Sequence, residues 1–321
     1  MGIYTGGHSG GLSPDAVLTS IDGVTYEEFT REQVPEYLGA TDGLFFKQGS
    51  TVGVGFIHDE DSNVGGFNET AEQEEILSED TWIGNQTTRM SQKYTNKIPI
   101  SDEAFQADMV GKRARIGQQV GDRARETRDR KAILSTYADA FDGSVFTTPD
   151  GQALASNSHT SLKGITVDNL ETGTLTPNNM WTAVVALANQ EAQDGDSGSH
   201  DLDGTLVPFT LYRTMKEVMN SQLKANGAEN NLNIFDTDYG QVQIRASIFL
   251  GSKYNSATNA NTSYHLIGRN HNICRKVFYG LSTKLLSPDY SDNDTYQHLS
   301  KFHEVSFPGT WTAYVGSNGT V

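Results

Sequence analysis

The stretch from residue 100 to residue 141 predicts one long amphipathic helix, and this helix constrains the fold more than any other segment. Apolar or small side chains recur along it, from Phe105 to Phe141, with a period near 3.6 residues. Ser101 is a good N-cap residue, and two acids follow it in the first turn. At ~1.5 Å per residue the helix would be roughly 60 Å long. We therefore expect it to lie along a surface, with one side packed on its own domain and the other side exposed for contact with another molecule.

The predicted helix is basic although the whole chain is acidic. The chain has 24 Lys and Arg residues and a formal net charge of -16. A third of these bases lie on the helix: Lys112, Arg113, Arg115, Arg123, Arg125, Arg128, Arg130 and Lys131. So large a negative net charge argues against nucleic-acid binding as the main task, because that task needs a basic surface.

Three glycines, Gly111, Gly117 and Gly121, interrupt the first half of the predicted helix. Each costs ~1 kcal/mol relative to alanine in a helix interior. Two explanations stay open, namely close packing against a neighbouring element or a helix that bends. We treat the three glycines as hinge candidates.

Residues 46–98, before the helix, predict an extended β-hairpin with an acidic middle. Strand-forming residues at 51–57 and 82–94 flank an excursion rich in Asp and Glu. Such a hairpin has no core of its own and needs another surface to lie on. We expect its acids to meet bases on or beside the long helix of a neighbouring copy; the acids are Glu72, Glu74, Glu75 and Glu79, and the bases are Arg113, Arg123, Arg125, Arg128 and Arg130. The alternative is pairing within the helix, with Asp108, Asp122, Glu126 and Asp129.

The remaining chain predicts an α+β fold with long connections. Thr176 and Pro177 begin a helix over 177–193, and Pro208 opens another that ends near Leu223. Between them we expect a polar loop over 194–204 and a short strand at 206–207. Alternating apolar residues predict further strands at 241–250 and within 297–315. We also expect strands at 264–267 and 277–281. Residues 1–45 are glycine-rich at their start and predict an arm that docks on a partner.

No segment has the residue spacing of a catalytic or metal site. Asp194, Asp196, Asp201, Asp203 and His200 do not follow the calcium-loop template, and neither do Asp289, Asp292 and Asp294. The single cysteine, Cys274, lies in an apolar context that favours a core thiol. No nucleophile elbow, phosphate loop or membrane-length apolar run occurs. We therefore expect no enzyme, no cofactor, no metal and no membrane contact, and the charge pattern favours self-assembly.

Several stretches resemble, in order, the major capsid proteins of tailed double-stranded DNA phages, and most of all the Mu-like major head protein family. Residues 150–159 (DGQALASNSH) resemble that family's Asp-Gly-x-x-Leu-x-Ser-x-x-His stretch, and residues 175–180 (LTPNNM) resemble its helix entry. Residues 206–208 with 219–221, then 230–235 and 311–317, also fit. The ordered set, which spans about 98 to 317, carries the resemblance.

The resemblance implies the α+β fold known as the Hong Kong 97 type. It implies an N-terminal arm (1–45), an extended E-loop hairpin (46–98), a P-domain (99–172) with a spine helix (101–141), an A-domain (173–285) and C-terminal strands that return to the P-domain (286–321). Some members of the lineage join subunits by a Lys–Asn isopeptide bond from the E-loop. No lysine lies between Lys47 and Lys93, so we expect no such bond here.

The implied function is that of a major head protein in the virion capsid. Hexamers and pentamers would form an icosahedral shell around the phage genome, assembled in the host bacterial cytoplasm. The implied partners are other copies of the chain, a portal, decoration proteins, a separately encoded scaffold, and packaged DNA held by weak, non-specific contacts.

Two alternatives stay open. An encapsulin-type nanocompartment shell shares the fold but encloses cargo enzymes, and neighbouring genes would distinguish the two. An acidic calcium-binding attachment protein is a more distant alternative, against which the poor spacing of the aspartates counts.

Overall fold

The structure is a computed structural model, and it describes residues 44–61, 83–101, 112–195, 198, 200–221, 233–286 and 295–320. Several predicted features lie outside these residues: the arm up to residue 43, the acidic excursion with Glu72, Glu74, Glu75 and Glu79, the first part of the long helix with Gly111, and the side chain of Arg113.

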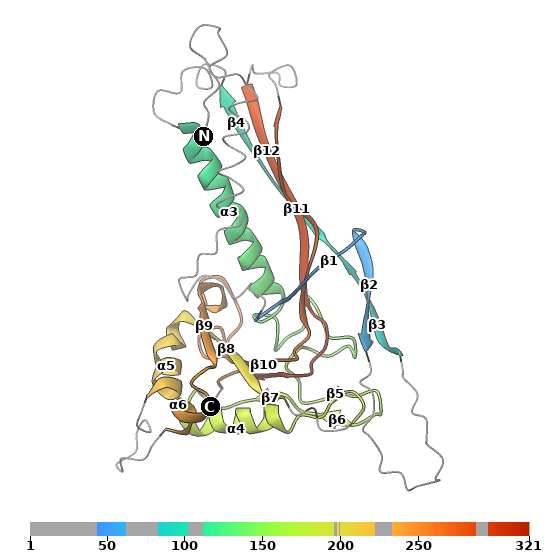
Figure 1. The fold of residues 1–321 in the computed structure, drawn as a ribbon, viewed down its shortest axis with the longest axis vertical. Coiled ribbons are helices and arrows are strands. Elements are labelled where there is room, and N and C mark those ends of the chain that lie inside the picture. Colours follow the sequence, from blue (N-terminus) through green and yellow to red (C-terminus); the bar gives the residue numbers. More distant parts are fainter. Residues whose placement is uncertain are drawn as a thin grey trace, which may run out of the picture.

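A long helix and a long sheet form one limb of the molecule (Figure 1). The helix is α3 (Lys112–Ser135), and the sheet has the strand order β1-β11-β12-β4. β11 (Ile273–Leu286) and β12 (Thr295–Pro308) form a long antiparallel pair. β4 (Gln92–Ser101) is antiparallel to β12, and β1 (Lys47–Ser50) is parallel to β11. α3 therefore rests on a four-stranded platform to which both ends of the described chain contribute.

A five-stranded mixed sheet forms the base of the molecule, in the order β7-β13-β10-β8-β9. Its strands are β7 (Leu170–Glu171), β8 (Leu202–Pro208), β9 (Gln243–Ser247), β10 (Tyr264–Gly268) and β13 (Tyr314–Ser317). The accompanying helices are α4 (Pro177–Ala188), η1 (Phe209–Leu211), α5 (Tyr212–Asn220), α6 (Ile234–Asp238) and η2 (Ile248–Leu250). One buried apolar cluster joins α4 and α5 to the sheet through Met180, Leu187, Val207, Met215 and Leu266. A second joins the C-terminal end of α3 to the same sheet.

The predicted hairpin is present as β2 (Gly55–Asp61) and β3 (Ile83–Met90), which pair in antiparallel fashion. Its base packs on the long sheet, where the rings of Phe56 and His58 lie 5.7 and 5.1 Å from that of Phe307. β2 begins later than expected, because residues 52–54 bend and the carbonyl of Val54 accepts a bond from the amide of Ser91. A separate short pair, β5 (His159–Thr160) and β6 (Thr166–Val167), completes the described strands.

The helix limits differ from those predicted. Ile100 and Ser101 belong to β4, where they pair with Tyr296 and Thr295, so the helix does not start there. At the other end α3 stops at Ser135 and irregular turns follow. The amide of Ala138 donates to the carbonyl of Ile133 rather than to the carbonyl four residues back. The carboxylate of Asp139 then accepts bonds from the amides of residues 144–146 and draws the chain into a turn.

Other boundaries were also wrong. α4 ends at Ala188, because the cap residue Asn189 leaves helical geometry. β8 already begins at Leu202, inside the expected polar loop, and ends at Pro208. Pro208 is also the N-cap residue of η1, which leads into α5, so the helix predicted after Pro208 is present but ends at Asn220 rather than near Leu223. β11 extends far beyond 277–281, and the expected C-terminal strand is two strands, β12 and β13. The turn that separates them places Ala313 at a φ of 56°.

Candidate assembly surfaces

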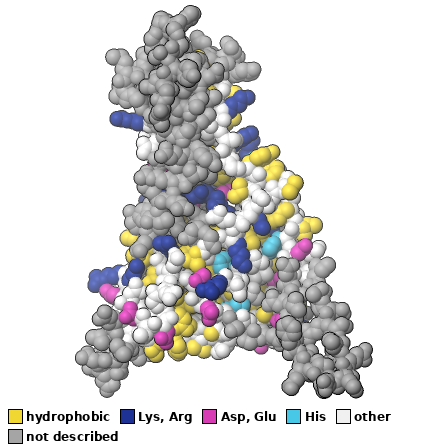
Figure 2. Space-filling model, in the orientation of Figure 1, with side chains coloured by type: hydrophobic (Ala, Val, Ile, Leu, Met, Phe, Trp, Pro, Cys, Tyr) yellow, Lys and Arg dark blue, Asp and Glu magenta, His cyan; other side chains and the backbone are white. Residues whose placement is uncertain are grey.

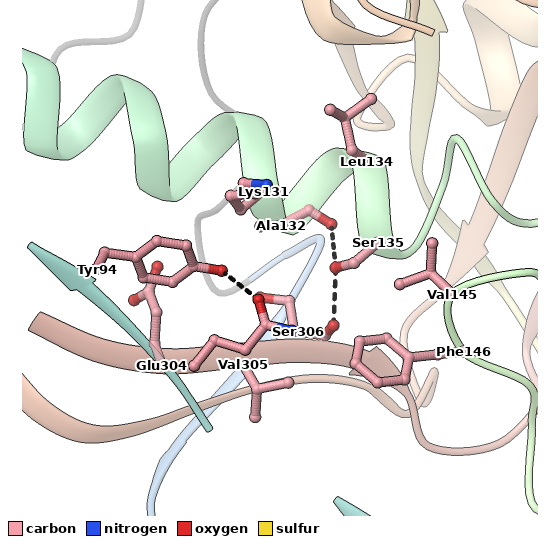
Figure 3. Close-up of a pocket in the computed structure, with 11 residues that line it drawn as sticks. Tyr94, Lys131, Ala132, Leu134, Ser135, Val145, Phe146, Glu304, Val305 and Ser306 are labelled. Carbon is pink, nitrogen blue, oxygen red and sulfur yellow. Dashed lines mark hydrogen bonds between the residues drawn. The ribbon is translucent and has the colours of Figure 1, made fainter. Parts of the chain in front are cut away.

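The groove between α3 and the long sheet is lined by side chains from both. Tyr94 of β4 stacks on Phe302 of β12, with ring centroids 5.0 Å apart. The Ser135 hydroxyl lies 2.8 Å from the carbonyl of Ser306 on β12 and 3.3 Å from that of Ala132, as Figure 3 shows. A hollow of about 200 Å³ remains beside these contacts and has Lys131 on its rim. The helix is thus held on the sheet by polar contacts as well as by apolar packing.

A buried ion pair lies on the sheet face beneath the helix. Arg275 of β11 donates to Glu304 of β12 from Nε at 3.1 Å and from a terminal nitrogen at 2.8 Å. Burial raises the pKa of Glu304, and Arg275 acts in the opposite direction. Burial and the nearby Glu304 charge raise the pKa of Tyr94 to about 12. A lone buried charge is costly, so Arg275 and Glu304 each need the other for α3 to pack on the long sheet.

The arginines of the helix pair with acids of the same helix. Arg123 lies 2.5 Å from Glu126, and Arg125 lies 3.1 Å from Asp122. Arg128 lies 3.0 Å from the neighbouring Asp129. Arg130 instead has its guanidinium 5.8 Å from the ring centre of Tyr254. The alternative of pairing within the helix is therefore realised for three arginines, and contact with a second copy stays a prediction.

Gly117 and Gly121 are both buried on α3. They lie one helical turn apart and therefore share a face of the helix. α3 nevertheless continues through both positions without a break up to Ser135. In this state of the chain the two glycines are part of a continuous, packed helix, and bending there stays a prediction.

The base of the hairpin is fixed to the body of the protein by buried polar groups. Glu60 of β2 accepts a hydrogen bond from Gln193 at 2.6 Å and a longer one from Asn85 at 3.5 Å. Burial and the nearby charge of Asp150 raise the pKa of Glu60 to about 7. Arg89 of β3 donates to the carbonyl of Thr147 and lies 5.1 and 5.4 Å from the ring centres of Phe146 and Phe307.

The sequence stretch 150–159 forms a buried polar cluster together with the C-terminal turn. His159 Nδ1 lies 2.7 Å from a carboxylate oxygen of Asp150, and the His159 ring stacks on Trp311 at 5.2 Å. Burial raises the pKa of Asp150, but hydrogen bonds from His159 and Thr148 outweigh it, so this pKa lies below its ordinary value. Neither partner of the stacked pair exposes its side chain. Residues of the stretch 150–159, which carries part of the family resemblance, thus hold the turn before β13 in position.

Two amides complete this cluster, and sequence reasoning missed both. Asn169 donates to the carbonyl of Leu154 at 2.9 Å, while its side-chain oxygen accepts from the amide of Ser156 at 2.8 Å. Gln190, just after α4, donates to the carbonyls of Trp311 and Tyr314. A lone Asn or Gln in a polar segment gives no signal in a sequence, because its partners are backbone atoms far along the chain.

The described residues contain no group of three or more His, Cys, Asp or Glu side chains positioned to hold a metal ion. None of their helices is both long and apolar enough to span a membrane. Cys274 is 4% exposed, as expected for a core thiol, and burial raises its pKa.

Several solved structures share the fold of this chain. The capsid of Ralstonia phage GP4 has a TM-score of 0.54 and 12% identity, covering 88% of this chain and 88% of that chain. The capsid of cyanophage P-SCSP1u has a TM-score of 0.55 and 11% identity, covering 90% of each. A virus-like particle from Pyrococcus furiosus has a TM-score of 0.52 and 8% identity, covering 93% of this chain and 98% of that chain. The fold is therefore the Hong Kong 97 type, as the sequence predicted.

The sequence comparison defines the family. Residues 85–268, more than half of the chain, match the family described as phage capsid protein, and the chain belongs to that family. No curated protein matches the chain in sequence. The predicted role as a phage capsid protein is thereby confirmed, and its place is the shell of the virion.

Proposed function

We propose that this chain is the major head protein of a tailed phage and assembles into the hexamers and pentamers of an icosahedral shell around the genome. The family match over residues 85–268 is the observation that carries this proposal. The extended shape supports it, because a limb of one helix and a long sheet offers far more surface than a compact domain would (Figure 1).

The parts of the shell subunit follow from the same proposal. The hairpin β2–β3 with the excursion beyond it is the E-loop, and residues 1–45 are the arm. α3 and the long sheet belong to the P-domain. Because β11 (Ile273–Leu286) is a strand of that sheet, we limit the A-domain to residues 173–272 instead of the predicted 173–285. β12 lies against α3, while β13 sits in the five-stranded sheet, so the C-terminal strands tie both parts together.

The finer assignment to the Mu-like head proteins rests on the ordered set of stretches between about 98 and 317, one of which is residues 150–159. The buried cluster that these residues form gives a physical reason for their spacing, since Asp150 fixes the imidazole that stacks on Trp311. Assembly in the host cytoplasm with a portal, a separate scaffold and decoration proteins belongs to the same proposal. The missing lysine in the excursion favours a shell without Lys–Asn cross-links.

Sedimentation of the protein expressed alone, and together with a candidate scaffold from the same genome, tests this function. We expect particles or capsomers many times heavier than the 35.1 kDa chain. A monodisperse monomer under both conditions would contradict the proposal.

An encapsulin-type shell is the alternative to test beside it, because the fold alone does not separate the two. The phage family match favours the head protein. Mass spectrometry of virions from infected cells should find this chain as their most abundant protein, whereas particles filled with a co-purifying enzyme would favour the alternative.

A further inference from the structure

The inward face of β2 carries two titratable side chains, His58 and Glu60. Successive side chains of a strand point to opposite faces, and along β2 positions 55, 57 and 59 are exposed while positions 56, 58 and 60 are sheltered. Figure 2 shows hydrophobic and acidic side chains at the surface on the side of the molecule where Figure 1 places the hairpin. The face that holds the hairpin on the body of its own chain therefore includes an imidazole and a carboxyl group.

The imidazole of His58 is packed closely against the long sheet. Its ring lies 5.1 Å from the ring of Phe307, and the guanidinium of Arg89 lies 5.4 Å from the centre of the same ring. His58 Nε2 is buried, and Gly309 leaves the space for it, since a Cβ at position 309 would lie 2.7 Å from this nitrogen. The imidazole and the guanidinium thus share one aromatic ring in a close-packed site.

The charges around His58 are mainly positive. Burial and the charge of Lys276 on β11 lower the pKa of His58. Arg89 on β3 acts in the same direction, whereas the Gly309 backbone and Asp59 on β2 act in the opposite direction. A proton on His58 would therefore place a positive charge near two others in a site with little access to water.

The carboxyl group of Glu60 has the opposite surroundings. The side chain is 1% exposed, and no Lys, Arg or His side chain that the structure describes forms an ion pair with it. Burial and the charge of Asp150 raise the pKa of Glu60 to about 7, against the opposing effect of the bonds from Asn85 and Gln193. Asp150 itself keeps its charge, because His159 Nδ1 lies 2.7 Å from it and holds its pKa low. An ionised Glu60 would therefore face a second carboxylate.

The body of the protein offers an acceptor for the proton of a neutral Glu60. The side-chain nitrogen of Gln193 lies 2.6 Å from Glu60 Oε1, a separation more typical of an O–H···O bond than of an N–H···O bond. Turning the amide over exchanges its nitrogen and its oxygen. The Gln193 oxygen, which is buried without a partner among the described residues, would then accept the carboxyl proton of Glu60. The site is therefore suited to the uncharged acid.

We propose that the root of the β2–β3 hairpin is a proton-operated latch, in which β2 stays on the body of its own chain only while His58 and Glu60 are both uncharged. Ionisation of either side chain places like charges near each other in a buried site, and this cost is relieved when β2 moves away from the body. The latch lies within a single chain, so the inference does not depend on the proposed shell.

The two side chains respond to pH in opposite directions. Because the pKa of Glu60 is raised in the folded chain, its contribution to docking is complete below pH 4.5 and is lost as the pH rises through about 7. Because the pKa of His58 is lowered, its contribution is complete above pH 6.5 and is lost as the pH falls through the lowered value. Docking should therefore be strongest between the two titrations and should weaken on both sides.

Hydrogen exchange of the full-length subunit, kept below the concentration at which it assembles, tests the latch. The protection factors of the β2 amides are measured from ~pH 4.5 to ~pH 9 and divided by those of β10, which lies in the sheet at the base. The ratio should pass through a maximum. We expect it to fall at least roughly tenfold on the alkaline side and by a smaller factor on the acid side.

Substitutions assign each side of the profile to one residue. Glu60→Gln should abolish the alkaline loss and keep the acid loss, and His58→Phe should do the reverse. Lys276→Met keeps the imidazole but removes a positive charge that acts on it, so the acid loss should shrink. The matched controls are Asp59→Asn, on the outward face of β2, and His303→Phe, on β12, and both should keep the two losses. Near-ultraviolet circular dichroism verifies that each variant is folded.

A wild-type ratio that is flat with pH, or that falls on one side only, would overturn the proposal. So would a loss that persists after the residue assigned to it has been replaced. Equal losses in β2 and β10 would show that the whole subunit opens, and the latch would also be rejected. A failure of the protein to form shells would leave these measurements unchanged and would overturn only the proposed function.

Discussion

Trp311 is the largest side chain that the described part of the fold buries completely. It stacks on His159, and its carbonyl accepts bonds from Asn169 and Gln190. Replacing Trp311 by alanine should cost ~3–5 kcal/mol, because the cavity adds to the lost transfer free energy. Trp181→Ala is the matched control, since Trp181 is 42% exposed and should lose far less. Thermal unfolding of assembly-blocked subunits measures both, and equal losses would contradict this account.

Glu60 should make the docking of the hairpin depend on pH. Burial and Asp150 raise its pKa from 4.5 to about 7 in the folded chain. A raised pKa means that the folded state favours the protonated form. Protonated Glu60 therefore contributes its full stabilisation of the folded state below pH 4.5, and this contribution is lost as the pH rises through about 7.

Glu60→Gln keeps a hydrogen-bonding side chain and removes the charge. We expect this variant to be more stable than the wild type at pH 8 by roughly 1–3 kcal/mol and to show a flatter dependence on pH between 5 and 8. Hydrogen exchange of the β2 amides, read over that range, reports the effect locally, with Asp59→Asn on the same strand as the control. An unchanged pH profile in Glu60→Gln would contradict the assignment.

At the level of elements, strong periodicity was a reliable guide. The long helix, α4 with its Thr176 cap, and the alternating strand β9 were all predicted from spacing, and the Thr176 oxygen does accept from the amide of Asn179. The strand β10 was expected as well and is buried at every position. The hairpin was predicted from two strand-forming stretches around an acidic excursion. These features are local, so the chain itself carries the signal.

Boundaries set by distant partners could not be predicted in this way. α3 stops at Ser135 because of the bonds of Asp139 and because the Tyr137 hydroxyl donates to the carbonyl of Phe45 at 2.6 Å. The buried pair Arg275–Glu304 joins residues 29 positions apart.

The buried glycines of α3 give a prediction for this helix. Gly117→Ala and Gly121→Ala, separately and together, should leave the subunit folded, with ~1 kcal/mol per site gained in helix propensity. Particle assembly or expansion should suffer, because a stiffer helix penalises a bent state. Measuring the melting temperature of the capsomers together with the particle yield distinguishes a helix that bends from a helix that only packs closely. A lower melting temperature without an assembly defect would show that the glycines serve close packing.

For the whole molecule, the acidic net charge predicts weak binding to DNA. Purified capsomers should bind duplex DNA only weakly and without sequence preference at ~0.15 M salt, because phosphate contacts dominate such affinity and screening already acts over ~8 Å. A wall that held the genome tightly would oppose both packaging and ejection. Filter binding over a salt series measures this, and tight binding at that salt would contradict the prediction.

The central claim is that copies of this chain form a closed icosahedral shell. A cryo-electron microscopy reconstruction of particles formed by the protein, expressed alone or together with a scaffold from the same genome, tests it most directly. We predict icosahedral shells in which α3 and the long sheet of each subunit pack side by side around five-fold and six-fold positions. Particles without that symmetry, or symmetric shells whose density does not accommodate this fold, would contradict the claim.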